Sequence, residues 1–165
     1  MDQSTRELLL LAGKEEFLQN GYLHASLRTI AAKAGVTTGA ICGYYTDKAA
    51  LFTALVKEPA DYLYHWYLST QQNFHKLEPH QQVSDLFRYS GSGLNHFIDY
   101  MYDHYDTFKL IISCSAGTEY EHYVDSLIDI EVDSTLEFIT VLRAMGHQVP
   151  DINADMAHIV SNGYY

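Results

Sequence analysis

Two short helical segments stand one after the other at residues 27–45, separated by a turn that contains a glycine. The first, LRTIAAKA at 27–34, carries its apolar side chains on one narrow face and is followed by Gly35. The second is expected to begin at Thr38 and to end at Tyr45. A helix, a glycine-containing turn of three to four residues and a second short helix form a helix-turn-helix. This motif restricts the local fold more narrowly than the longer helical patterns after it.

The stretch TTGAICGYY, residues 37–45, contains two glycines, although glycine is about 1 kcal/mol less favourable than alanine inside a helix. Close docking of one backbone against another needs small residues, and Gly39, Ala40 and Gly43 supply them. We therefore interpret both glycines as positions of close approach. An ordinary helical hairpin with a loose turn is the alternative.

In a helix-turn-helix the second helix enters the major groove of DNA, and its first residues meet the base edges. Thr37 and Thr38 stand at this start, where hydroxyl and backbone N–H groups can reach phosphates or bases. Tyr44 offers a further hydroxyl at the far end. The motif therefore predicts DNA binding.

Helical spacing of apolar residues recurs along the rest of the chain, without the alternation typical of strands and without internal repeats. We therefore predict an all-α fold. Pro59 lacks a backbone N–H, so a kink or break is expected there. The other helices are expected at residues 4–20, 48–57, from Tyr62 onward, 81–103, 106–115, 118–145 and from about Asn153.

The helix expected at 118–145 is apolar on more than one face: a stripe through Val124, Ile128 and Val132 is supplemented by Leu127 and by neighbours outside it. A helix of this kind is packed on more than one side. It is either a central core helix or a core helix that also meets a partner subunit.

Charge is distributed unevenly along the chain, whose net charge is −11. Residues 1–57 carry six basic and five acidic groups, a net of +1, whereas residues 58–165 carry four basic and 16 acidic groups, a net of −12. The acidity that argues against nucleic-acid binding is therefore confined to the second part. This split indicates two modules with different partners.

No secretory signal pattern stands at the N-terminus, and no segment approaches the roughly 20 apolar residues that span a bilayer. Cys42 and Cys114 are far apart and outside any CxxC pattern. A disulfide framework is therefore not expected, and a cytoplasmic location fits better.

The run FLQNGYLHASLRTIAAKAGVTTGAICGYYTDKAALFTALV, residues 17–56, resembles the N-terminal domain of TetR/AcrR-family transcriptional regulators. This resemblance implies a helix-turn-helix DNA-binding domain at 1–47 and a helical ligand-binding and dimerisation domain at 48–165. Family members normally continue beyond this length, so the second domain is expected to be incomplete at its C-terminus. The shared features are Phe17, Asn20-Gly21-Tyr22, Ser26, Ile30-Ala31, Ala34-Gly35-Val36, Gly39, the aromatic pair Tyr44-Tyr45, Asp47-Lys48 and Leu51.

Carried over by position, the resemblance assigns base or phosphate contacts to Arg28, residues 37–40, Tyr44 and Lys48, and a place in the domain core to Tyr45. Cys42 departs from the family, which typically has tyrosine there, and this puts one contact to the DNA backbone in doubt. The nine expected DNA-binding residues are Arg28, Thr37, Thr38, Gly39, Ala40, Cys42, Gly43, Tyr44 and Lys48.

In this architecture, aromatic and apolar residues of the second part would surround a small-molecule cavity. Plain core packing is the alternative for each of them. Surplus carboxylates beside aromatic rings would suit a cationic ligand. The expected ligand-binding residues are Trp66, Phe97, Tyr100, Met101, Tyr105, Phe108, Ile112, Tyr120 and Tyr123.

Catalysis and metal binding have no comparable sequence support. Histidines and acids at helical spacing occur at 96–104 and 119–125, but no CxxC or HExxH pattern accompanies them. No GxSxG, phosphate-binding glycine loop or paired-acid arrangement is present either. We expect no catalytic residue, no metal and no cofactor.

Together the motif and the resemblance imply a homodimeric prokaryotic regulator, most simply a repressor released from a palindromic operator in double-stranded DNA by an unknown small-molecule effector. An all-helical small-molecule binding protein or enzyme with a vestigial helix-turn-helix is the alternative. DNA binding in an architectural role, without a ligand, is a third possibility and predicts that no cavity forms.

Overall fold

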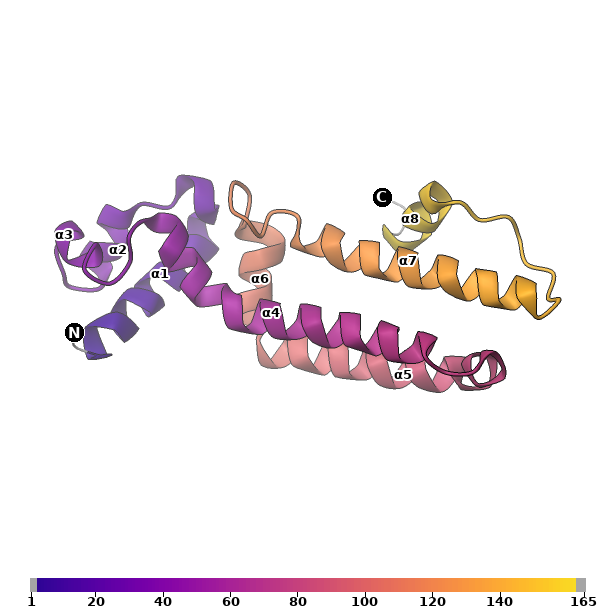
Figure 1. The fold of residues 1–165 in the computed structure, drawn as a ribbon. Helices are drawn as coiled ribbons and strands as arrows, with labels where there is room; N and C mark the ends of the chain where they lie inside the picture. The colour runs from indigo at the N-terminus through magenta and orange to yellow at the C-terminus, as the bar shows by residue number, and fades with distance from the viewer. Residues whose placement is uncertain (1–2, 163–165) are drawn as a thin grey trace. The chain divides into compact units, whose positions relative to one another are not determined.

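The computed structural model describes residues 3–162, apart from the side chains of Gln3, Ala154 and residues 160–162. These residues form α-helices and connecting turns, with no strand among them, which confirms the all-α fold (Figure 1). The helices are α1 (Gln3–His24), α2 (Leu27–Lys33), α3 (Thr38–Ile41), α4 (Lys48–His75), α5 (Pro79–Asp103), α6 (Tyr105–Cys114), α7 (Tyr123–Ala144) and α8 (Ala154–Asn162).

The chain divides into two compact units. The first contains the residues up to Asp61 together with His104–Tyr123, and the second contains Tyr62–Asp103 and the residues from Val124 onward. The helix α4 therefore contributes to both units, and α6 belongs with the N-terminal helices. The domain boundary expected between residues 47 and 48 stays a prediction, because compactness alone does not define a folding domain.

Aromatic packing between α1 and α4 forms the core of the first unit. Phe17 and Phe52 are fully buried and meet edge to face, with ring centroids 5.1 Å apart. Tyr22 meets Phe52 in the same way at 5.5 Å. Aromatic pairs of this geometry add about 0.5–1.5 kcal/mol beyond the area that they bury. The helix α6 packs against α1 and buries Leu110 and Ile111.

The turn between α2 and α3 is a helix-capping motif that requires glycine. The Val36 N–H donates to the Ala31 carbonyl at 3.0 Å, and the Gly35 N–H donates to the Ala32 carbonyl at 3.2 Å. This pair of hydrogen bonds is the Schellman arrangement, in which the residue after the helix adopts a left-handed conformation. Gly35 has φ 70°, and Gly21 at the corresponding place in α1 has φ 68°. The helix α2 therefore ends where its glycine predicts, whereas α1, expected to end at residue 20, is kinked at Gly21 and continues to His24.

The helix α3 is shorter than expected, since it ends at Ile41 and not at Tyr45. Its last turn tightens, because the Gly43 N–H donates to the Ala40 carbonyl three residues back at 3.2 Å. The Tyr44 N–H binds the Ile41 carbonyl in the same way at 2.8 Å. Such bonds replace the regular helical pattern at helix ends.

Two further expectations about helix limits are corrected by the structure. The long helix expected from 118 begins at Tyr123, because Gly117 has φ 83° and the Thr118 hydroxyl donates to the Ser115 carbonyl at 2.7 Å, so that these residues form turns. Of the kink or break expected at Pro59, the break does not occur, since α4 continues through it. The helix α4 loses one backbone hydrogen bond at Pro59, because proline has no N–H. The next residue, Ala60, is nevertheless buried in the core.

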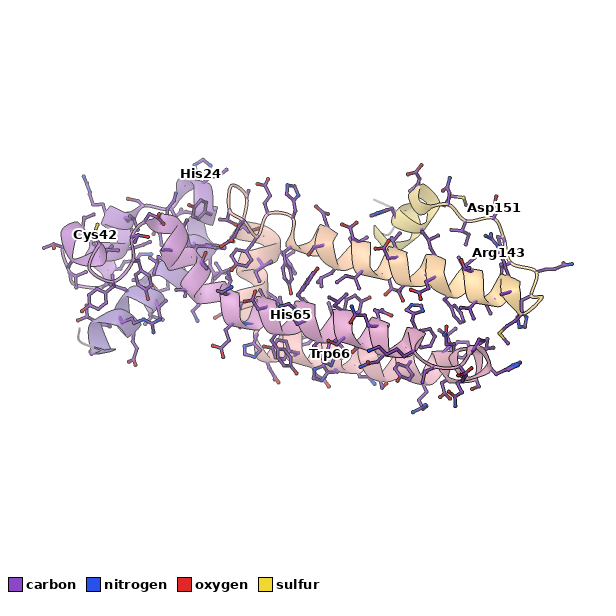
Figure 2. The ribbon with its side chains drawn as sticks, in the orientation of Figure 1. His24, Cys42, His65, Trp66, Arg143 and Asp151 are labelled. Atoms are coloured by element: carbon purple, nitrogen blue, oxygen red, sulfur yellow. The ribbon has the colours of Figure 1, made fainter. Side chains whose placement is uncertain are left out.

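The second unit is built from the later part of α4 together with α5, α7 and α8. Phe74 of α4 contacts Tyr89 of α5 and Phe138 of α7, with both ring centroids 5.5 Å away. The residues after α7 are tied back to it, because the Arg143 guanidinium lies 3.1 Å from the Asp151 carboxylate (Figure 2).

The Lys48 side chain connects the start of α4 to the end of α1. Its ammonium donates to the backbone carbonyls of Tyr22, Leu23 and Ala25 at 2.7, 3.3 and 3.2 Å, and lies 4.5 Å from the centre of the Tyr22 ring. The last carbonyls of a helix lack intrahelical donors and carry partial negative charge. Lys48 supplies the missing donors and a compensating positive charge.

We predict that Gly35→Ala lowers the free energy of unfolding by about 1–2 kcal/mol, because alanine is strained in the left-handed region. Gly39→Ala is the matched control. Gly39 lies in α3 without a positive φ, and an added Cβ would meet no atom closer than 4.0 Å. Its stability should be unchanged or slightly increased. Urea unfolding of both variants tests this, and equal losses of stability would contradict it.

We predict that Lys48→Met lowers the free energy of unfolding by about 1–2 kcal/mol, because three carbonyls lose a charged donor. The control is Lys57→Met in the same helix, because the Lys57 ammonium pairs, among the described residues, only with the exposed Asp61 carboxylate at 2.8 Å. That change should cost less than about 0.5 kcal/mol. Thermal unfolding followed by circular dichroism measures both, and a Lys48→Met variant as stable as Lys57→Met would refute the helix-end role.

Candidate functional site

The nine residues expected to contact DNA lie on α2, on α3 and the residues that flank it, and at the start of α4, all within the first unit. Six of them are exposed and three are half-buried. The exposed ones are Arg28, Thr37, Thr38, Gly39, Cys42 and Gly43, and the half-buried ones are Ala40, Tyr44 and Lys48. None of the nine is buried in the core, so all are open to contact by another molecule.

The two threonines at the start of α3 are used differently. Thr37 caps the helix, because its hydroxyl oxygen accepts from the Ala40 N–H at 3.2 Å. A hydroxyl that accepts can still donate its own proton. Thr38 makes no side-chain hydrogen bond with any described residue and is exposed. Both hydroxyls are therefore available as donors to a partner.

Glycine occurs at two positions of this segment, and the space around an added Cβ differs between them: it is restricted at Gly43 and open at Gly39. A Cβ on Gly43 would lie 3.3 Å from the Ala40 carbonyl oxygen, so a tight turn of the chain itself favours glycine there. A Cβ on Gly39 would meet only the Thr37 hydroxyl oxygen, at 4.0 Å. The close approach expected from the sequence thus lies within the chain at Gly43, and at Gly39 it would have to involve another molecule.

The basic residues of the motif differ in how far they are engaged. Lys33 pairs with the buried carboxylate of Glu16 at 3.2 Å, and Lys48 binds the end of α1. Arg28 is exposed and forms no ion pair or hydrogen bond with the described residues. Among these three, Arg28 is the cation most readily available to a phosphate group. A phosphate contact by Lys48 stays a prediction, since its ammonium already has three acceptors.

Tyr45 and Cys42 differ in burial: Tyr45 lies in the domain core and Cys42 lies on the surface. Tyr45 is buried, in agreement with its expected place in the core, and burial raises the pKa of its hydroxyl while the positive charge of Arg6 partly opposes the shift. Cys42 is exposed, with its sulfur 4.0 Å from the Thr38 carbonyl oxygen (Figure 2). The departure at Cys42 is therefore a surface change.

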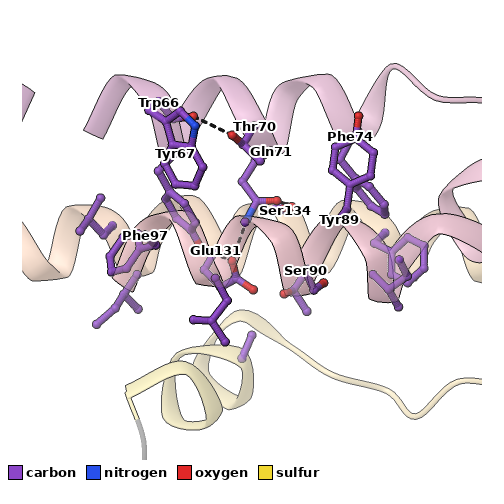
Figure 3. A pocket seen from close by; sticks show the side chains of 18 of the residues that line it. Trp66, Tyr67, Thr70, Gln71, Phe74, Tyr89, Ser90, Phe97, Glu131 and Ser134 are labelled. Carbon is purple, nitrogen blue, oxygen red and sulfur yellow. Dashed lines mark hydrogen bonds between the residues drawn. The ribbon is translucent and has the colours of Figure 1, made fainter. Parts of the chain in front are cut away.

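A cavity of about 750 Å³ lies within the second unit (Figure 3). Its walls are mainly apolar and aromatic, with several amide and hydroxyl groups. It is lined from α4 by Trp66, Tyr67, Thr70, Gln71 and Phe74, from α5 by Leu86, Tyr89, Ser90, Gly93, Leu94 and Phe97, from α7 by Val124, Leu127, Ile128, Glu131, Ser134, Thr135 and Phe138, and beyond α7 by Ile152 and Ala157.

Hydrogen bonds join residues of α4 and α7 that line this cavity. The Tyr67 hydroxyl and the Gln71 amide, at 2.8 Å, both donate to the Glu131 carboxylate. The Ser134 hydroxyl donates to the Gln71 carbonyl oxygen at 2.8 Å and lies 2.8 Å from a ring nitrogen of His75. Burial raises the pKa of the Tyr67 hydroxyl, and its hydrogen bond to Glu131 raises it further. Tyr67 is therefore a neutral donor at ordinary pH.

Only two of the nine residues expected to bind a ligand, Trp66 and Phe97, line this cavity. Tyr100 and Met101 belong to the same unit, and Tyr100 stacks on Tyr62 at 4.4 Å. The other five belong to the first unit and are Tyr105, Phe108, Ile112, Tyr120 and Tyr123.

The sequence reasoning missed the residues of α7, above all Glu131 and Ser134. The spacing of Ile128, Glu131 and Thr135 could have indicated them, because it places polar groups on a helix face that is otherwise apolar. Among the described residues, no group of three histidines, cysteines or acids could hold a metal ion. In the same part of the chain, no helix is long and apolar enough to cross a membrane.

Comparisons with known proteins place the helix-turn-helix segment in a family. Residues 9–55 match the family model described as bacterial regulatory proteins, tetR family. The HTH-type transcriptional repressor BepR of Brucella suis biovar 1 (strain 1330) is 42% identical over 52 residues. That stretch is 32% of this chain and only 25% of BepR, so the similarity to this curated relative spans a quarter of its length.

Solved structures resemble the chain over most of its length. NalD, the secondary repressor of the MexAB-OprM multidrug efflux pump in Pseudomonas aeruginosa, matches 96% of this chain and 78% of its own, with a TM-score of 0.51 and 20% identity. A second, native NalD structure gives a TM-score of 0.50 at 20% identity, over 93% and 77% of the two chains. At this identity the likeness concerns the fold alone. The family model and the repressor relative both match this segment, so residues 9–55 form a helix-turn-helix segment of the type found in bacterial regulatory proteins of the tetR family.

Proposed function

We propose that this protein is a sequence-specific DNA-binding regulator of transcription, acting as a homodimeric repressor that a small molecule releases from its operator. The observation that carries the proposal is the exposed set formed by Arg28 and the start of α3, within the segment that matches the tetR family model. We expect it to act in the cytoplasm.

The chemistry of the exposed set suits DNA. Arg28 supplies a positive charge without an internal partner, and the hydroxyls of Thr37 and Thr38 can donate to phosphate oxygens or base edges. Gly39 leaves space for close approach of a sugar-phosphate backbone. The net charge of +1 over residues 1–57 is compatible with this role, while the acidic remainder is not expected to touch DNA.

The cavity supports the ligand-responsive part of the proposal. Its volume of about 750 Å³ falls within the roughly 300–1,000 Å³ common for small-molecule sites, and its walls combine aromatic rings with a few polar groups. A ligand that binds one arrangement of the dimer more tightly shifts the population toward it. Release follows if that arrangement does not match the spacing of the operator half-sites.

Binding of the purified protein to the DNA upstream of its own gene tests the proposal. Fluorescence anisotropy against a labelled fragment and an unlabelled competitor of unrelated sequence measures specificity, and light scattering measures the mass of the complex. We expect specific binding by a dimer. Equal affinity for both fragments at physiological salt would overturn the proposed function.

We predict that Arg28→Ala weakens operator binding and reduces the slope of log affinity against log salt by about 0.9, the value for one lost phosphate contact. Its thermal stability should be unchanged. Lys48→Ala is expected to reduce the slope by about one as well, but with a loss of stability. An unchanged salt slope in Arg28→Ala would exclude the phosphate contact.

Thr38→Ala is expected to act on sequence preference and not on the salt slope, because a hydroxyl carries no charge that releases counterions. Discrimination against substituted operators should fall by about 1–3 kcal/mol at one base pair. Competition with a set of single-base operator variants measures it. A uniform loss across all variants would place Thr38 against the DNA backbone instead.

We predict that Cys42→Tyr tightens operator binding by about fivefold at every salt concentration. A tyrosine hydroxyl can donate to a phosphate oxygen, which a thiol does poorly, and this is expected to contribute about 1 kcal/mol at an exposed site. Since Cys42 is exposed, the larger ring should not overpack the domain. A lower melting temperature together with weaker binding would show that the ring displaces part of the core.

A further inference from the structure

The cavity of the second unit has one formally charged side chain on its wall, that of Glu131. The other described residues that line it are apolar, aromatic, amide or hydroxyl bearing, and none is a lysine, arginine or histidine. Figure 3 shows the Glu131 side chain at the cavity wall with the hydrogen bond that Gln71 donates to it. An apolar cavity with a single anion has a definite electrostatic preference.

The partners of Glu131 are neutral and occupy only one of its oxygens. The Tyr67 hydroxyl and the Gln71 amide both donate to Oε2. No ion pair joins Glu131 to any described residue, and Oε1 accepts no hydrogen bond from them. A carboxylate offers about four lone-pair sites. The charge is thus held in place by the protein but is not neutralised by it.

The surroundings favour a positive charge beside Glu131. Trp66, Phe74 and Phe97 line the same cavity, and aromatic ring faces attract cations. The second unit carries three basic and 11 acidic side chains, a net of −8 over residues 62–103 and 124–165. This charge adds a long-range potential that attracts cations and repels anions.

We propose that the cavity binds an apolar organic cation, with its aromatic or aliphatic bulk against the rings and its positive charge beside Oε1 of Glu131. This inference rests on the proposed ligand-responsive function and names the chemical class of the effector. An anionic ligand would meet an uncompensated carboxylate, and a neutral one would leave that carboxylate without a counter-charge.

Two ions of closely similar size and shape and opposite charge test the proposal, namely tetraphenylphosphonium and tetraphenylborate, both in sodium buffer. Trp66 is the single tryptophan of the chain and lines the cavity, so its fluorescence reports binding there. We expect the cation to bind at least about tenfold more tightly than the anion. Calorimetric titration provides a second measurement that does not depend on the fluorophore.

Three variants separate the charge of Glu131 from its structural role. Glu131→Gln keeps the shape and the acceptor oxygen, and is expected to remove most of the preference for the cation. Asp133→Asn makes the same change of charge at an exposed position of the same helix and should retain the preference. Tyr67→Phe removes a hydrogen-bond donor but leaves the carboxylate charged, so the preference should persist. Melting temperatures confirm that each variant is folded.

Preference for the anion, equal affinities, binding of neither ion, or an unchanged ratio in Glu131→Gln would each overturn the proposal. Anisotropy of labelled operator DNA distinguishes its failure from that of the proposed function. If an anionic or neutral compound releases the operator while tetraphenylphosphonium does not bind, the regulator remains and the ligand class is wrong. If tetraphenylphosphonium binds through Glu131 while no specific DNA binding occurs, the ligand class stands and the regulator is wrong.

Discussion

The contact between Lys48 and the end of α1 closes a loop of the chain, and the helix-turn-helix is what that loop contains. The ammonium joins residue 48 to the carbonyls of residues 22, 23 and 25. The helices α2 and α3 lie between these points, and α3 has only four residues. A helix of that length cannot be stable alone. Its position depends on Ile41, which is fully buried, and on the fixed ends of the loop.

Most of the first unit could be predicted from the sequence, because its signals are local. Gly35 ends α2 and Gly21 kinks α1, both in left-handed conformations, and Asp47 caps α4 by accepting a 2.7 Å hydrogen bond from the Ala50 N–H. The length of α3 could not be predicted in this way. Its end depends on short-range bonds around Gly43 that compete with regular helical ones at similar energy.

The cavity was harder to predict, because it depends on which helices meet. Phe108 and other apolar residues of α6 recur at the spacing expected of residues that line a cavity, but they belong to the first unit. Glu131 and Tyr67 are 64 positions apart, and only the pairing of α4 with α7 makes them neighbours. Local periodicity predicts that α7 is buried on more than one side without identifying the helices that cover it. The residues at the interface of these helices therefore escaped the sequence reasoning.

The hydrogen bonds around Glu131 also bear on the entropy of binding. A free glutamate side chain has several rotatable bonds, and ordering such a side chain on association costs roughly 0.5–1.5 kcal/mol. Here Tyr67 and Gln71 already hold the carboxylate through Oε2 before any ligand arrives. That conformational cost is met during folding, so the cavity is preorganised at its charged point. A cation can then be bound without a further cost for ordering Glu131, and the aromatic walls add contacts to the apolar part of the ligand.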